Sequence, residues 1–150
     1  MPDFKPAFPD FEQRVRDSFA RQSLMTTLGA RMTHVAPGEV HIELPFSAAL
    51  LQQQGFVHAG AITSVVDSAC GYAALILLPE THEVVSVEFK VNFLNPAKGA
   101  RFVAVGRVFK AGRTLSVCSG ELTGFDGDSQ KSIALMQTTM MAVAATPPAA

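Results

Sequence analysis

The stretch GFVHAGAITSVVDSACGYAALILLP, residues 55–79, decides how this chain folds. It is almost wholly apolar, and Asp67 near its middle is the single acidic or basic residue, histidine aside, between Glu43 and Glu80. A helix that is apolar on nearly every side is buried by the elements around it. Its many alanines and glycines let those elements approach closely. The stretch therefore predicts a central buried helix that holds a lone carboxylate.

A membrane span is disfavoured for the same stretch. Residues 61–78 are at the short end of the roughly 20 residues that a span needs. Asp67 at the centre would cost about 2.5–3.5 kcal/mol on insertion scales. Residues 1–19 carry charges where a signal peptide has an apolar region. We therefore expect no membrane partner and a cytoplasmic location.

Length and charge narrow the class of protein further. The 150 residues suit one domain, 1–150, with a substantial core. The formal net charge is −1 and the basic residues are scattered. This distribution argues against an electrostatic nucleic-acid surface, so we expect no nucleic-acid partner.

The cysteines and histidines give no sign of a metal or redox site. Cys70 and Cys118 lie in apolar stretches without a CxxC motif, which is typical of buried, reduced thiols. His34, His41 and His82 show no metal-ligand spacing along the chain. We therefore expect no metal site and no cofactor.

The residues before the central stretch predict a helix and two strands. Residues 1–9 hold three prolines and are expected to form a flexible arm. Residues 10–28 are expected to form one amphipathic helix with Asp10 as a plausible N-cap. Apolar residues recur in it at helical spacing, namely Phe11, Val15 and Phe19. Short strands are expected at 31–36 and 39–46, on either side of a Pro-Gly turn.

After the central helix the hydrophobic period changes to two. In VVSVEFKVNF, residues 84–93, the pattern predicts a strand with an apolar and a polar face. The expected polar face consists of Ser86, Glu88, Lys90 and Asn92. Three more strands follow, joined by short turns, and the tail 145–150 is expected to be disordered.

This order of elements predicts an α+β fold. Long strands joined by short turns can cover one apolar helix only by forming a curved antiparallel sheet around it. That arrangement is the hot-dog fold, here with its core at 31–143 and an extra N-terminal helix.

The segment QQQGFVHAGAITSVVDSACGYAA, residues 52–74, resembles the signature of hot-dog thioesterases of the phenylacetate-degradation (PaaI-like) type. That signature has an amide residue, a glycine, a His-Gly-Gly triplet, and a carboxylate eight residues after the first glycine of the triplet. The matching positions here are Gln52, Gly55, the HAG triplet at 58–60, and Asp67. The triplet departs from the pattern because its first glycine is an alanine.

Two further segments extend the resemblance to about residues 44–143. The strand VVSVEFKVNFLNPAKG, residues 84–99, resembles the strand that follows in the family, with Ser86 where a serine or threonine helps to place water. The turn KAGRTLSV, residues 110–117, resembles the family hairpin with its G-K/R-T/S pattern.

The resemblance implies an acyl-CoA thioesterase that acts as a dimer or a dimer of dimers, with coenzyme A present only as part of the substrate. The implied catalytic or positioning residues are Gln52, His58, Ala59, Asp67 and Ser86. The implied substrate contacts are Gly55, Gly60, Ser68, Lys90 and Arg113. For Lys90 and Arg113 the alternative is an exposed charge without a ligand, and for His58 a structural role is favoured over proton transfer.

The residues themselves support this chemistry. The first turn of a helix has unsatisfied N–H groups and a partial positive charge, so the Ala59 N–H can serve as an oxyanion hole. Asp67 can act as general base on water or attack the thioester directly. Eight residues span about 12 Å of helix, so one carbonyl cannot contact both groups of a single chain. A two-fold dimer with antiparallel central helices would bring them together.

Other interpretations stay open at this point. Asp67 can instead be a structural group bonded to Ser64, Ser68 or a neighbouring backbone group. A hydratase or dehydratase uses the same architecture, although with other motifs. A non-catalytic acyl-CoA-binding protein is compatible with the alanine in the triplet. The acyl group can be aromatic or of medium chain length, since both suit the expected apolar lining from Leu50, Leu51, Phe56 and Tyr72.

Overall fold

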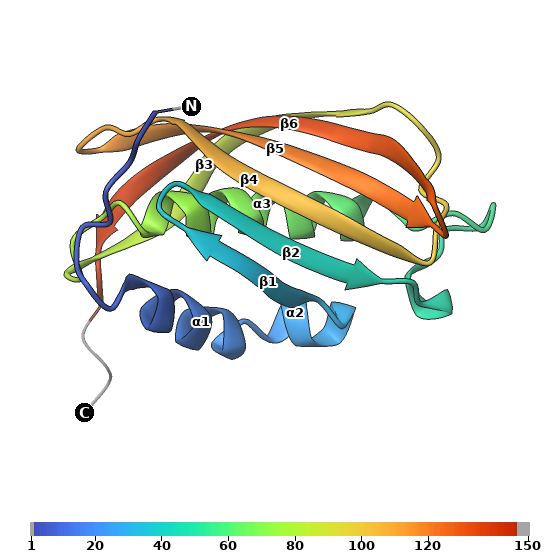
Figure 1. Ribbon diagram of the computed structural model, residues 1–150, viewed down its shortest axis with the longest axis horizontal. Helices are drawn as coiled ribbons and strands as arrows, with labels where there is room; N and C mark the ends of the chain where they lie inside the picture. Colours follow the sequence, from blue (N-terminus) through green and yellow to red (C-terminus); the bar gives the residue numbers. More distant parts are fainter. Residues whose placement is uncertain (1, 147–150) are drawn as a thin grey trace.

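The fold is described by a computed structural model that covers residues 2–146 (Figure 1). Its strands are β1 (Arg31–Ala36), β2 (Glu39–Pro45), β3 (His82–Phe93), β4 (Arg101–Lys110), β5 (Leu115–Asp126) and β6 (Ser129–Ala144). They form one antiparallel sheet in the order β1-β2-β4-β5-β6-β3. The sheet curves around helix α3 (Ala59–Leu75), and a short 3₁₀ helix, η1 (Ala48–Leu50), precedes it. This arrangement confirms the predicted hot-dog fold.

Close packing against the sheet explains why α3 is rich in small residues. Val65, Val66 and Ala69 are fully buried. A Cβ atom added to Gly106 of β4 would lie 2.3 Å from the backbone carbon of Ala69. Only glycine therefore lets β4 cross the helix at this height. Each large apolar side chain buried in this way stabilises the fold by roughly 1.5–3 kcal/mol.

A β-bulge in β3 corrects the predicted faces of that strand. Ser86 pairs with Met140, which is buried toward α3, whereas Glu88 pairs with Thr139 on the opposite, convex face. The extra residue Val87 between these pairs reverses the alternation. The prediction that Ser86 shares a face with Glu88 and Lys90 is therefore wrong.

The single helix expected over 10–28 is two helices, α1 (Phe11–Arg21) and α2 (Ser23–Leu28). Gln22 between them is extended, with φ −79° and ψ 92°. On one continuous helix Val15 and Leu28 would point about 140° apart. Both are buried in the structure, so the break lets each helix turn its apolar side to the core. Helix α1 begins after Asp10, whose side chain makes no capping hydrogen bond.

The N-terminal arm is held against the core rather than loose. The Ala7 N–H donates to the carbonyl oxygen of Ile76 over 3.1 Å, and Phe4 packs over Gly38. At the other end, the Ala145 N–H donates to the Thr81 carbonyl oxygen over 2.9 Å. The rest of the expected tail, 147–150, lies outside the described residues. Within residues 2–146 no helix has the length and hydropathy to cross a bilayer.

Candidate active site

The start of α3 presents a free backbone donor to solvent. His58 is the N-cap, and its Nδ1 accepts a hydrogen bond of 2.8 Å from the Gly60 N–H. With Nδ1 as acceptor, the neutral ring has its proton on Nε2. The Ala59 N–H has no acceptor among residues 2–146, and Ala59 is exposed. The helix dipole adds partial positive charge at this point, so an incoming oxygen atom is favoured there.

A groove of about 530 Å³ lies in front of this helix start. Gln52, His58 and Ala59 line it together with apolar side chains that include Phe56 and Phe93. The Gln52 side chain accepts a hydrogen bond from the Gln54 N–H, which shapes the turn that leads to the helix. Gly55 in that turn has φ +86°, a conformation that favours glycine. Gly55 therefore shapes the loop and is not part of the lining of the groove.

The middle of α3 presents Asp67 to a separate cavity of about 140 Å³. The Ser86 hydroxyl of β3 donates to Asp67 Oδ1 over 2.8 Å. The two serines proposed as structural partners point elsewhere: Ser64 donates to the Gly60 carbonyl oxygen, and Ser68 donates to Gln22 Oε1. Asp67 is therefore held by Ser86, the residue for which the family resemblance implies a role in placing water.

Burial determines the ionisation of the groups around Asp67. Desolvation raises the pKa of Asp67 above its ordinary value of 3.8, and the hydrogen bond from Ser86 opposes that rise. Desolvation also raises the pKa of the Cys118 thiol to about 12 and that of Cys70 well above its ordinary value, and the Asp67 carboxylate adds to both. Both cysteines are free and buried, as predicted. At neutral pH both thiols are therefore protonated, so the groups of this cavity that can act as base or nucleophile are the carboxyl groups of Asp67 and Glu83.

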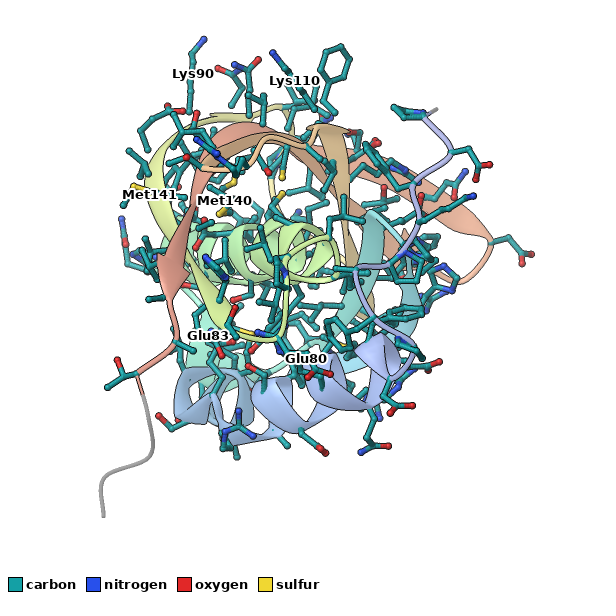
Figure 2. All side chains as sticks on the ribbon, turned by 90° about the vertical axis from the view of Figure 1, so that its left-hand side faces the viewer. Glu80, Glu83, Lys90, Lys110, Met140 and Met141 are labelled. Atoms are coloured by element: carbon teal, nitrogen blue, oxygen red, sulfur yellow. The ribbon has the colours of Figure 1, made fainter. Side chains whose placement is uncertain are left out.

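Most of the predicted site residues lie either at the groove or at the Asp67 cavity, and two of them, Lys90 and Arg113, lie at neither. Gln52, His58, Ala59 and Gly60 lie at the start of α3, whereas Asp67, Ser68 and Ser86 surround the smaller cavity. Lys90 lies on the convex face of the sheet, where it points away from α3 together with Lys110 (Figure 2). It lines a third, larger hollow of about 730 Å³ that includes neither Ala59 nor Asp67. Arg113 is exposed in the β4–β5 turn and lines none of the three hollows, so its role stays a prediction.

Several residues near the site were not predicted. Gln22 and Glu83 line the Asp67 cavity together with Tyr72, which was expected in the lining of the acyl site instead. Gln22 reaches the cavity because the break between α1 and α2 directs it toward α3. No periodicity in the sequence marks that break. Lys98 lies with its Nζ atom 5.1 Å from the centre of the Phe56 ring, next to the groove. Its place in the NPAKG turn, directly after the strand with Phe93, is the signal that would have found it.

Comparison with known proteins identifies the family. The family model of the thioesterase superfamily matches residues 54–130, which is just over half of the chain. The matched range contains helix α3, which borders both the groove and the Asp67 cavity. The chain belongs to the thioesterase superfamily. This confirms the predicted hot-dog thioesterase class and the predicted hydrolase activity.

Solved structures and a curated relative agree with this assignment. The thioesterase is 50% identical to a thioesterase family protein of Silicibacter pomeroyi, with a TM-score of 0.88 and coverage of 90% of this chain and 99% of that one. The PaaI protein of Escherichia coli, from the phenylacetic acid degradation operon, is 19% identical with a TM-score of 0.81 over 91% of this chain and 96% of that one, which shows the shared fold. The medium/long-chain acyl-CoA thioesterase YigI of Escherichia coli is 28% identical over 82 residues, or 46% of this chain and 53% of that protein.

Proposed function

We propose that this thioesterase hydrolyses an aromatic or medium-chain acyl-CoA to the free acid and coenzyme A. The observation that supports this most is that α3 carries two complementary groups: a free N–H at Ala59 and, at Asp67, a carboxyl group with a raised pKa. Hydrolysis of a thioester needs a group that stabilises the developing oxyanion and a group that activates or replaces water. Water is the only co-substrate that the reaction needs, and no cofactor takes part in it.

In the proposed reaction the thioester oxygen accepts a hydrogen bond from the Ala59 N–H. Asp67 removes a proton from a water molecule whose oxygen attacks the carbonyl carbon, and Ser86 holds that water and the carboxylate in place. The carbon–sulfur bond then breaks, and coenzyme A leaves as a thiolate that takes up a proton. Direct attack by Asp67 is the alternative route, which passes through a mixed anhydride that water hydrolyses.

The proposed site lies between two subunits. Ala59 and Asp67 are separated by about 12 Å along α3, and they face different cavities. A two-fold dimer with antiparallel α3 helices would place the carboxylate of one chain beside the helix start of the other. The long strand β3 supports such a dimer, since it pairs with β6 on one side and its outer side pairs with no strand among residues 2–146. Its Val87 and Phe89 are 53% and 44% exposed, which a second copy would cover.

The groove at the helix start supports the proposed substrate class. It is lined by Phe56, Phe93 and Leu94, which suit an aromatic or aliphatic acyl group. We propose Lys98, next to Phe56, as a contact for the phosphates of coenzyme A in place of Lys90 on the convex face. The medium/long-chain acyl-CoA specificity in the name of YigI and the operon of PaaI point to the same two acyl classes.

Thiol release tests the proposal. A panel of aromatic and aliphatic acyl-CoAs is offered to the wild type and to Asp67→Asn, with protein-only blanks for the two cysteines. We expect turnover to fall by at least about 10³-fold in the variant, with an unchanged oligomer, because asparagine can accept the Ser86 hydrogen bond but cannot take a proton. Absence of turnover with every acyl-CoA, or equal turnover in both proteins, would contradict the proposed role of Asp67.

A further inference from the structure

The β1–β2 hairpin brings together two histidines and a glutamate that the thioesterase site does not use. His34 and His41 are paired across the two strands, with ring centres 4.6 Å apart. Glu39 precedes His41 by two residues, so both side chains lie on one side of β2. His41 Nε2 is 2.6 Å from Glu39 Oε1. One donor atom from each of the three residues lies within 4.8 Å of the other two.

This cluster lies on the outer side of the sheet, away from α3. Along β2 the buried Val40 and Ile42 alternate with Glu39 and His41, which are half-buried. His34, on the edge strand β1, is exposed. A small ion therefore reaches the cluster from solvent without any movement of the backbone.

We propose that His34, Glu39 and His41 form a binding site for a divalent transition-metal ion of the zinc class. Two neutral imidazoles and one carboxylate are a donor set that such ions favour, and a fourth position stays open to water. In a tetrahedral zinc site with bonds of about 2.0–2.1 Å, neighbouring ligand atoms lie roughly 3.3 Å apart. The three side chains reach that spacing by small rotations, since their donors are already within 4.8 Å.

Arg107 of β4 determines how the glutamate is held. Its Nε donates to Glu39 Oε2 over 2.9 Å, which leaves Oε1 directed at His41. Carboxylates that bind a metal ion are usually held in place by hydrogen bonds of their own, and Arg107 supplies such a bond to Glu39. The ion replaces the proton between His41 Nε2 and Glu39 Oε1, and these two atoms must separate by less than about 1 Å. The positive charge of Arg107 opposes the ion, so we expect weaker binding than in a closed structural zinc site.

The site would fasten the edge of the sheet. β1 is one of the two edge strands, and its pairing with β2 shifts register between Met32 and His34. A metal ion bound to His34 and to two residues of β2 cross-links the strands at that point. An ion that binds only the folded state stabilises it in proportion to the logarithm of its concentration. The readout is therefore independent of thioesterase activity.

Metal titration of the tag-free, metal-depleted protein tests this site. Zn²⁺ binding is measured by calorimetry, and Co²⁺ binding by its visible absorption, at pH 7.5. We expect one ion per chain in the wild type, at least a tenfold loss of affinity in His34→Ala and in His41→Ala, and unchanged binding in His82→Ala. His82 serves as the matched control because its side chain lies outside the cluster and, among residues 2–146, hydrogen-bonds only to Thr81.

Thermal unfolding of the same proteins adds a second readout. Zn²⁺ is expected to raise the midpoint of the wild type and of His82→Ala but not that of His34→Ala, whose exposed side chain is not needed for folding. Undetectable binding to the wild type, or binding that survives both substitutions in the hairpin, would overturn the proposal.

Discussion

The start and the middle of α3 differ in nearly every physical respect. The start is exposed, opens into a groove of about 530 Å³, and offers a backbone N–H at Ala59. The middle is half-buried, opens into a smaller cavity of about 140 Å³, and offers the carboxylate of Asp67. One end suits an electron-rich oxygen and the other suits a proton or an electrophilic carbon. Neither end is a complete catalytic site, so the division between them argues for a site shared by two chains.

After the loss expected for Asp67→Asn, the largest effect is expected when the donor at the helix start is removed. Ala59→Pro removes the N–H but suits the position, since proline is favoured at the first residue of a helix. His58 before it is already extended, at φ −61° and ψ 138°, as a residue before proline should be. Thiol release is expected to fall by about 10²–10³-fold, which is the usual effect of one lost oxyanion donor.

The matched control for that variant is Ala59→Val, which adds similar bulk to the groove but keeps the N–H. It is expected to retain far more activity than Ala59→Pro at equal folded content, measured by circular dichroism. Equal losses in both variants would mean that space in the groove, rather than the N–H, limits turnover.

A smaller effect is expected in the middle of the helix when Ser86 loses its hydroxyl. The hydrogen bond from Ser86 holds the pKa of Asp67 down, so Ser86→Ala raises that pKa further. Asp67 must be ionised to act, and activity therefore rises with pH through its pKa. The acid limb of kcat/KM is expected to move to higher pH, with the greater loss below the limb. A smaller loss is expected above the limb, because the hydroxyl also helps to hold the attacking water.

Two controls make the Ser86 result specific. Ser86→Thr keeps a hydroxyl and is expected to restore the position of the limb, and Ser119→Ala on the convex face is expected to leave it unchanged. A limb that does not move in Ser86→Ala would show that another group controls the pH profile.

The smallest effect is expected on stability. Because the folded-state pKa of Asp67 is raised, its contribution to stability is fully present below about pH 3.8 and is lost as the pH rises through the folded-state value. Once ionised, the half-buried carboxylate therefore destabilises the fold, and Asp67→Asn is expected to raise the unfolding midpoint at pH 7 by a small amount. The gap between the two proteins should shrink as the pH falls. A variant that is less stable than the wild type at pH 7 would contradict this.

Much of the fold could be predicted from the sequence because its signals are local. The apolar stretch around Asp67 can only be a buried helix, and strands of period two joined by short turns can only cover it as a curved sheet. The position of the helix start follows from the HAG triplet. These features depend on neighbouring residues and on hydrophobic pattern alone.

The missed features arise from tertiary packing. The bulge at Val87 places Ser86 against Asp67 and turns Lys90 to the other face. No residue type in the strand indicates from sequence that a bulge occurs there. The break at Gln22 follows from the need to bury both helices on one core. The meeting of His34 and His41 follows from the Pro-Gly turn midway between them, so their spacing along the chain conceals their closeness.

The most direct test of the shared site mixes two inactive chains. Ala59→Pro retains Asp67 and Asp67→Asn retains the Ala59 N–H, so a mixed dimer contains one intact site if each site uses both chains. When the two variants are mixed in equal amounts and their subunits re-pair at random, about half of the dimers contain one chain of each variant. Each of these has one intact site of two, so about a quarter of wild-type thiol release is expected. A mixture that stays as inactive as its components, although mixed dimers have formed, would contradict a site shared across the subunits.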